Sequence, residues 1–238
     1  GTIQSFLKFH NPKGITVPTY IDENLVSFVG YVISESYHTK NRIKFSNSDK
    51  DTLKHFDYLS KRLFSLDPIK RINKGVPEIE INSKTLTDYL SHILNFNPKT
   101  SGYKEIPSKL MGMPDNLTAI LLRVLFDMEG FVPKLTKNSG TEIEFSSKSK
   151  KLVEQVQLLL NRFGIVGRFK EKNIKGNKYY RLFIAGSDDH RRFRDKIGFS
   201  ISYKAERLNI LCGCGLKRNK FYLPIVSLLD EIRKKFKV

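Results

Sequence analysis

The sequence predicts an α+β fold in which one α-β-β-α-β-β-α unit is written twice. Two apolar helical segments each end in a glutamate, Glu35 and Glu129, which stand 94 residues apart. The same pattern, Ile-x-Phe-Ser, follows each segment within alternating stretches at 40–47 and 141–147. Strict alternation predicts half-buried strands, and repetition of the whole order at this separation indicates an internal duplication.

Each half is predicted to form a four-stranded antiparallel sheet with its helices on one face. Later strand candidates are split by the turns Asn73-Lys-Gly75 and Lys175-Gly-Asn177, which favour hairpins. Apolar residues at helical spacing predict the remaining helices. In chain order the predicted elements are a helix at 25–36, a strand at 40–47, a helix at 53–63, strands at 68–72 and 78–82 and a helix at 85–94, then a helix at 121–130, a strand at 141–147, a helix at 152–163, strands at 166–172 and 178–185 and a helix at 187–197.

A stretch rich in proline and glycine separates the two units and reads as a linker. Beyond the second unit, residues 221–236 carry an amphipathic pattern entered after Pro224. We expect this helix to pack on the core rather than to contact a nucleic acid, because it has an apolar stripe. The predicted segments are residues 15–96 (first unit), 97–114 (linker), 115–204 (second unit) and 205–238 (C-terminal extension).

The chain is strongly basic. Of its 238 residues 42 are Lys or Arg and 24 are Asp or Glu, which gives a net charge of +18 at pH 7. An excess this large favours a polyanionic partner, most simply nucleic acid, over a merely solvated basic surface. The longest apolar stretch, 117–132, is broken by charges and too short to span a bilayer. With no signal-peptide pattern and only Cys212 and Cys214 as cysteines, we expect a reduced intracellular protein, and one Cys-x-Cys is a weak signal for zinc.

The paired glutamates predict a metal site. Glu35 and Glu129 each stand at a helix C-terminus, where the helix dipole disfavours negative charge. A divalent cation held between them would reverse that unfavourable electrostatics.

Basic side chains recur on one face of corresponding strands. In the second unit they alternate with Phe169, which points to the opposite face. Exposed Arg and Lys on twisted strands suit a nucleic-acid groove, and their repetition in both units argues against an ordinary solvated face. These residues are Arg42 and Lys44 in the first unit and Arg168, Lys170 and Lys172 in the second.

The two acidic segments resemble the paired motifs of the LAGLIDADG homing endonucleases. Phe28-Val-Gly-Tyr-Val-Ile-Ser-Glu-Ser36 fits the first motif, with its third residue at the helix-crossing glycine. Leu122-Arg-Val-Leu-Phe-Asp-Met-Glu-Gly130 fits the second, with the final glycine ending the helix. The resemblance covers about residues 15–210. It includes Ile106-Pro107 before the second motif helix and Ile197-Gly-Phe199 followed by Lys204.

The motifs also depart from the family pattern. Ile33 stands where an aspartate is frequent, and Ser36 replaces the final glycine of the first motif. Val124 and Met128 stand where small residues usually allow the two helices to pack closely.

The resemblance implies a pseudo-twofold arrangement in which the motif helices pack side by side. Their acids would meet at the floor of a saddle formed by the two sheets, with double-stranded DNA across it. Glu35 and Glu129 would be catalytic and would bind Mg²⁺, or another divalent cation such as Mn²⁺, with the backbone carbonyls of Ser34 and Met128 as further ligands. The basic residues expected to contact DNA are Arg42, Lys44, Lys70, Arg71, Lys134, Lys137, Arg168, Lys170, Lys172 and Arg181.

Lys148 is a further candidate catalytic residue. In the family a lysine at the end of the second strand of a repeat often lies near the active site, where it can stabilise phosphate charge. Aligning the two Ile-x-Phe-Ser stretches places Lys148 at that position and Ser48 at its counterpart. Lys148 reads equally well as a surface residue that begins a helix.

The resemblance implies a monomeric, site-specific endonuclease that makes a metal-dependent double-strand break at a long asymmetric target. The alternative is a non-cutting binder, either an intron-RNA splicing maturase or a DNA-binding regulator. Retention of both acids favours the enzyme. The form Gly30-Tyr-x-x-Ser-Glu35 is most similar to endonucleases of archaeal inteins and introns. Because the chain shows no splicing signature, we expect a free-standing enzyme or an endonuclease domain of a larger precursor.

Overall fold

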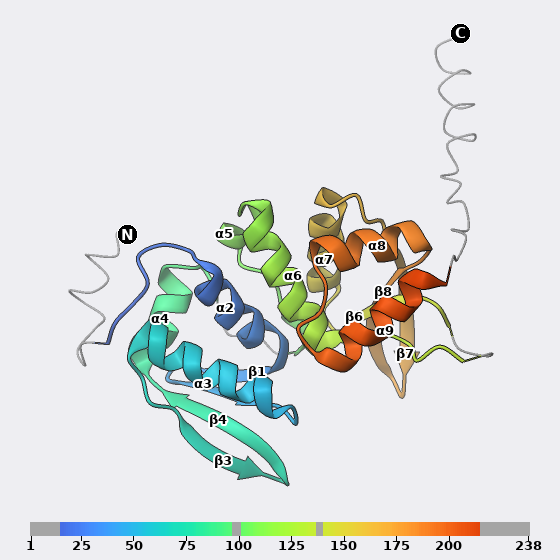
Figure 1. Cartoon of the computed structure of the whole chain (residues 1–238). Helices are drawn as coiled ribbons and strands as arrows, with labels where there is room; N and C mark the ends of the chain where they lie inside the picture. The colour runs from blue at the N-terminus through green and yellow to red at the C-terminus, as the bar shows by residue number, and fades with distance from the viewer. Residues whose placement is uncertain (1–14, 97–100, 137–139, 215–238) are drawn as a thin grey trace.

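Two α/β halves lie side by side in the computed structural model, which describes residues 15–96, 101–136 and 140–214 (Figure 1). The duplicated order predicted from the sequence is confirmed. The first half contains α2 (Glu23–Glu35), β1 (Ser36–Thr39), β2 (Arg42–Ser46), α3 (Lys50–Phe64), β3 (Ile69–Asn73), β4 (Val76–Asn82) and α4 (Lys84–His92). The second contains α6 (Asp115–Glu129), β5 (Gly130–Phe131), β6 (Ile143–Ser147), α7 (Lys150–Arg162), β7 (Arg168–Ile174), β8 (Asn177–Ile184) and α8 (Ser187–Lys196), followed by α9 (Ser202–Gly213).

Each half forms one four-stranded antiparallel sheet, in the order β1-β2-β4-β3 and β5-β6-β8-β7. The outer strands β1 and β5 had no predicted range. They begin at Ser36 and Gly130, directly where the motif helices end. At four and two residues they are too short for an alternating pattern to be recognised.

The hairpins β3–β4 and β7–β8 turn through matching two-residue loops. Lys74 and Gly75 have φ of 48° and 82°, and Lys175 and Gly176 have φ of 48° and 79°. Two successive positive φ values define the turn that matches the right-handed twist of paired strands. The glycine-containing turns predicted from the sequence therefore lie at both hairpin tips.

One face of each sheet packs on helices through the shared Ile-x-Phe pattern. In the first half Phe45 stacks on Phe56 of α3, with ring centroids 4.5 Å apart. In the second half Phe145 contacts Phe126 of α6 at 5.2 Å. All four rings are fully buried, so burial of aromatic area fixes which face of each sheet turns inward. The other face is left open.

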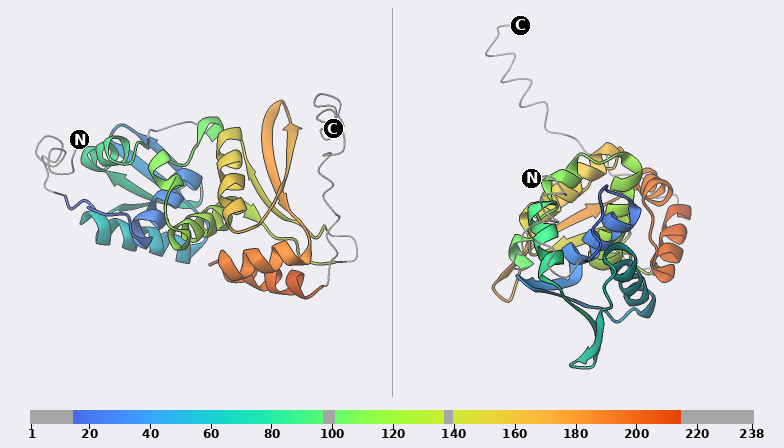
Figure 2. Two further views of the ribbon diagram at one scale, coloured as in Figure 1. Left: turned by 90° about the horizontal axis from the view of Figure 1, so that it is seen from above. Right: turned by 90° about the vertical axis from the view of Figure 1, so that its left-hand side faces the viewer.

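Helices α2 and α6 pack against each other at the centre of the molecule (Figure 2). They pack tightly at Gly30, where an added Cβ would lie 2.8 Å from Cγ1 of Val124. The valine that departs from the family pattern therefore packs against a position that has no side chain. A glycine on one helix accommodates the larger residue on the other, and the two helices remain in contact.

The segment predicted as a linker is packed onto the second half. It contains a 3₁₀ turn, η1 (Ser101–Tyr103), and a short helix, α5 (Ser108–Met111). The side chain of Gln155 on α7 accepts a hydrogen bond from the Ile106 N–H at 2.8 Å and donates to its carbonyl at 2.9 Å. This two-way contact holds the linker in place beside α7.

Helix α9 crosses the predicted boundary between residues 204 and 205, so this stretch is one structural unit. The helix predicted at 221–236 lies outside the described residues. Cys212 is buried and Cys214 exposed, and neither forms a disulfide. In the part of the chain that the structure describes, no helix is long and apolar enough to cross a membrane.

Candidate active site and nucleic-acid interface

The two acids lie at the same end of the packed helix pair. Glu35 is solvent accessible and the Glu129 side chain is 21% exposed. Burial of the two carboxyls raises the pKa of each, and the nearby positive charge of Lys104 lowers both pKa values in part. The negative charge of Glu35 raises the pKa of Glu129 further. The two carboxylates therefore share one electrostatic site, as the matched motif positions predicted.

The chain leaves each motif helix in extended backbone. Gly130 has φ −90° rather than the left-handed conformation common after helices. Glycine fits there for a different reason, because an added Cβ would lie 2.3 Å from the carbonyl oxygen of Phe126. At the equivalent position in the first half Ser36 donates its hydroxyl to the Val32 carbonyl at 2.6 Å. The serine thus forms a local bond at the position where the family has glycine.

Lys104 reaches this site from the linker and was not among the predicted site residues. Its Nζ donates to the backbone carbonyl of Ser34 and lies 3.3 Å from Oε1 of Glu129. Its side chain is only 17% exposed. One ammonium therefore connects the C-terminus of α2 to the acid of α6. The position of Lys104, two residues before Ile106-Pro107, was the available sequence signal.

Lys204 occupies the corresponding place at the end of α6. Its buried Nζ donates to the carbonyls of Asp127 and Gly130, both at 2.6 Å, and to that of Phe126 at 3.3 Å. Burial lowers the pKa of Lys204, and the neighbouring acids, including Glu129, oppose that shift. Lysine charge at a helix C-terminus is favourable. Each motif helix thus ends against a lysine from a later segment of the chain: Lys104 of the linker at α2 and Lys204 of α9 at α6.

The two halves hold these later segments differently. The carboxylate of Asp127 on α6 accepts hydrogen bonds from the Ser200 N–H at 3.0 and 3.1 Å and from the Ile201 N–H at 3.4 Å. Ile33 stands at the equivalent position of α2 and cannot accept such bonds. Gln155 instead holds the linker. The hydrogen bonds that Ile33 cannot make to the linker are thus replaced by those of Gln155 on α7.

The donor atoms at the helix ends suit a hard divalent cation. The described residues include no group of three or more His, Cys, Asp or Glu side chains that could hold a metal. Mg²⁺ is commonly bound through one or two carboxylates, with waters and substrate phosphates completing its shell. Glu35 and Glu129 fit that pattern, whereas the Ser34 carbonyl, also a predicted ligand, accepts a hydrogen bond from Lys104 in this structure. The Met128 carbonyl is the other predicted ligand. Their role as ligands stays a prediction.

The open faces of the two sheets carry most of the predicted DNA-binding residues. Arg71 pairs with Glu78 across β3 and β4, so it shares a face with the other first-half cations. Lys70 points the other way and forms an ion pair with Asp57 of α3 at 3.3 Å, which removes it from this set. Lys134 is exposed in the loop after β5, and Lys137 lies outside the described residues. The predicted cations on open faces are Arg42, Lys44, Arg71, Arg168, Lys170, Lys172 and Arg181.

Carboxylates lie among these cations. In the first half Glu78 and Glu80 are buried, and Lys44 Nζ lies 3.1 and 3.3 Å from them. A hydrogen bond from Asn82, together with the nearby cations, lowers the pKa of Glu80. In the second half Arg181 and Arg168 pair with Glu144 and Glu142. The open faces are therefore ordered networks of ion pairs rather than simple positive surfaces, which the count of basic residues did not predict.

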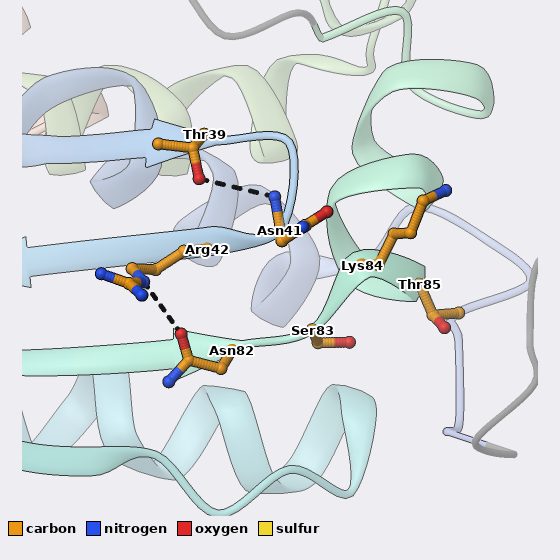
Figure 3. A pocket seen from close by; sticks show the side chains of 7 residues that line it. All are labelled: Thr39, Asn41, Arg42, Asn82, Ser83, Lys84 and Thr85. Atoms are coloured by element: carbon orange, nitrogen blue, oxygen red, sulfur yellow. Dashed lines mark hydrogen bonds between the residues drawn. The ribbon is translucent and has the colours of Figure 1, made fainter.

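Beside the start of β2 and the end of β4 lies a pocket of about 540 Å³ (Figure 3). Arg42 lines it and donates from Nε to the Asn82 side chain at 3.0 Å. Ser83, at the same end, caps α4 by accepting a hydrogen bond from the Leu86 N–H. The end of this face thus holds its arginine in a fixed place.

The predicted catalytic residue Lys148 lies at the end of β6, as the alignment indicated. Its ammonium is 5.4 Å from the ring centroid of Tyr179 on the open face of β8. The lysines that contact the ends of the motif helices are Lys104 and Lys204. The catalytic role of Lys148 stays a prediction.

Comparison with known proteins identifies the family. Residues 116–198 match the model of the LAGLIDADG-like domain. Over 207 residues the chain is 34% identical to the replication factor C small subunit of Methanocaldococcus jannaschii, covering 82% of this chain and 11% of that protein. It is 30% identical to the replication factor C small subunit of Thermococcus kodakarensis, covering 81% of this chain and 22% of the other. The chain thus spans less than a quarter of the length of either relative.

Solved structures share the fold. The homing endonuclease I-DmoI in complex with DNA and calcium matches with a TM-score of 0.57 at 17% identity, over 79% of this chain and 97% of that one. The N-terminal LAGLIDADG domain of WhiA matches with a TM-score of 0.53 at 16% identity, over 82% and 90%. The two sheets and central helix pair are therefore the LAGLIDADG fold. Residues 116–198 therefore carry a LAGLIDADG-like domain, and the fold extends over both halves.

Proposed function

We propose that this protein is a homing endonuclease that cuts both strands of a long, asymmetric DNA target in a metal-dependent reaction. The proposal depends on one observation: Glu35 and Glu129 lie at the neighbouring C-terminal ends of the packed helices α2 and α6, with Lys104 and Lys204 beside them. A protein that only binds nucleic acid has no need for two carboxylates against helix C-termini, where they are electrostatically unfavourable.

The matched relatives support an inserted element. The chain matches about 200 residues in a replication factor C subunit, a glutamine–fructose-6-phosphate aminotransferase and a DNA polymerase. These are three different kinds of protein, and the chain covers only 11%, 21% and 12% of their respective lengths. A segment common to such different hosts is the pattern of a mobile insertion. We therefore favour an intein- or intron-type endonuclease, acting inside the cell.

The chain's own residues suit phosphodiester hydrolysis. Glu35 and Glu129 would hold Mg²⁺ or Mn²⁺, which when bound activates water and stabilises the attacking and leaving oxygens. Lys104 and Lys204 place positive charge where scissile phosphates would gain negative charge. Because one chain supplies both acids and both sheets, we propose that it acts as a monomer.

Most of the affinity would come from phosphate contacts. The net charge of +18 and the cations of both open faces support double-stranded DNA as the partner. The two faces differ in sequence and in ion pairing, which supports an asymmetric target.

Cleavage of an insertion-free copy of the host gene tests the proposal. The full chain is incubated with that duplex and Mg²⁺, and the products are separated on native and denaturing gels. A double-strand break that Glu35→Gln and Glu129→Gln both abolish, with DNA binding kept within about tenfold, is the expected result. Full cleavage by either variant would remove these acids from the active site.

The same measurement separates the enzyme from a binder. Binding without cleavage in both Mg²⁺ and Mn²⁺ would favour a DNA-binding regulator. Preference for structured intron RNA over duplex DNA would favour a splicing maturase.

A further inference from the structure

The two open faces carry inverted ion pairs at equivalent positions. Residues 44 and 144 correspond, because each lies between the buried Ile and Phe of the shared pattern. In the first half this position is Lys44, paired with Glu78 and Glu80 of β4. In the second half it is Glu144, paired with Arg181 of β8. The two faces therefore offer different chemistry to the DNA that would cross them.

Arg181 is the most tightly held of the paired arginines on these faces. It lies on the inner strand β8 opposite Ser146 and Lys170. Its Nε and Nη2 donate to the two carboxylate oxygens of Glu144. Its guanidinium also lies 4.8 Å from the ring centroid of Phe183. The side chain is 27% exposed, against 48% for Arg42, 54% for Arg71 and 42% for Arg168.

These contacts leave a defined edge of the guanidinium free. Arginine has five N–H donors in a fixed plane, and Glu144 uses two of them. The hydrogens on Nη1 and the second hydrogen on Nη2 are directed away from the carboxylate. Two parallel donors of this kind match the O6 and N7 acceptors of guanine in the major groove.

The carboxylate also makes phosphate a poor partner for Arg181. Glu144 neutralises the arginine charge and would repel a phosphate placed beside it. Directional hydrogen-bond donors survive that neutralisation, whereas long-range attraction to the backbone does not. Lys170 and Lys172 on β7 are exposed and are better suited to phosphates.

We propose that Arg181, held by Glu144 and Phe183, reads a guanine in the half-site that contacts the second sheet. This assignment rests on the proposed function only in requiring that the open faces bind duplex DNA. Holding the guanidinium in advance reduces the ordering cost of binding. The fixed plane also makes the contact selective for a base that presents two adjacent acceptors.

Selection from a randomised duplex library tests the assignment. The full-length protein is used without divalent metal, so that bound DNA is not cut, and the selected pool is sequenced. Wild type is expected to require guanine at one position of one half-site. In Arg181→Ala the preference at that position should fall about 10- to 100-fold, while preferences elsewhere persist.

Two further variants make the result specific. Arg181→Lys keeps the charge and an aliphatic stem but lacks the planar fork. A lysine ammonium can still donate to O6 and N7, so the guanine preference should be weakened but less than in Arg181→Ala. Arg71→Ala is the matched control on the other sheet. It should leave this guanine preference intact and alter binding only through the other half-site. Circular dichroism confirms that each variant is folded.

Several outcomes would overturn the assignment. If Arg181→Ala weakens all sequences equally and lowers the salt slope by about 1, the arginine contacts a phosphate. If the guanine preference persists in Arg181→Ala, another residue reads that base. When wild type still cuts its selected target in Mg²⁺ in either case, the proposed function survives and only this assignment fails. If wild type selects no duplex sequence at all, both fail together.

Discussion

Adding one methyl group at Gly30 should separate the motif helices and thereby disable the active site. An added Cβ lies 2.8 Å from Cγ1 and 3.1 Å from Cβ of Val124, and 3.5 Å from Leu121. A valine in a helix is confined mainly to one rotamer, so it cannot swing aside. The helices must move instead, and overpacking of this kind costs about 1–3 kcal/mol.

The net loss in Gly30→Ala is smaller than the steric cost alone. Alanine is favoured over glycine in a helix by about 1 kcal/mol, which leaves a net destabilisation of up to about 2 kcal/mol. For a chain of this size that corresponds to a decrease of up to about 8 °C in Tm. Val124→Ala alone should cost about 2 kcal/mol because it empties part of a buried contact.

A double-mutant cycle measured by thermal unfolding distinguishes this steric effect from others. In Gly30→Ala/Val124→Ala the Cγ1 clash is gone, so the double variant should be more stable than the sum of the single losses by about 1–3 kcal/mol. Gly213→Ala is the control, because an added Cβ at that helical glycine meets nothing within 4 Å. Additivity within about 0.5 kcal/mol would refute the close approach at Gly30.

Four further predictions concern the site and its environment. Burial raises the pKa of Glu35 and Glu129, so both carboxyls should become protonated, and Mn²⁺ affinity should weaken, already at a pH above the ordinary glutamate pKa of about 4.3. Titration calorimetry at several pH values measures this, and an affinity that stays constant down to about 4.3 would contradict the raised pKa values. Lys148→Met should slow cleavage of one strand about 10²–10³-fold so that nicked DNA accumulates, and equal loss on both strands would remove Lys148 from the site. The half-buried His38 is stacked on Phe96, and burial lowers its pKa to about 4. It is therefore neutral in the folded state, and stability should fall as the pH falls from about 6.5 toward 4, by up to about 3 kcal/mol. In His38→Phe the free energy of unfolding should depend less on pH, and an unchanged slope would exclude this histidine. The logarithm of DNA affinity should fall linearly with the logarithm of salt concentration, with a slope on the order of −5 if about six phosphates are neutralised, and a weak salt response would argue against DNA as the partner.

Local patterns were sufficient to predict most helices and strands. Both hairpins and the first motif helix lie close to their predicted ranges, because side-chain periodicity reports directly which face of an element is buried. The second motif helix, α6, begins at Asp115 rather than at the predicted residue 121. Strands β1 and β5 were not predicted, because two to four residues are too few to show an alternating pattern of apolar side chains. The linker was predicted as a simple connection because proline and glycine content says nothing of the hydrogen bonds by which Gln155 holds Ile106.

The sequence by itself determined the duplication, the basic charge and the two acids at matching helix ends, since each of these is a property of composition or local order. Only the tertiary structure decided which groups surround the acids. Lys104 and Lys204 reach the motif helices from segments about 70 residues or more along the chain. It likewise decided that Lys70 turns toward α3 and that Arg181 is held by Glu144. Periodicity indicates that a face is buried or open, but the partner across a contact depends on how the chain returns through space, which no local pattern encodes.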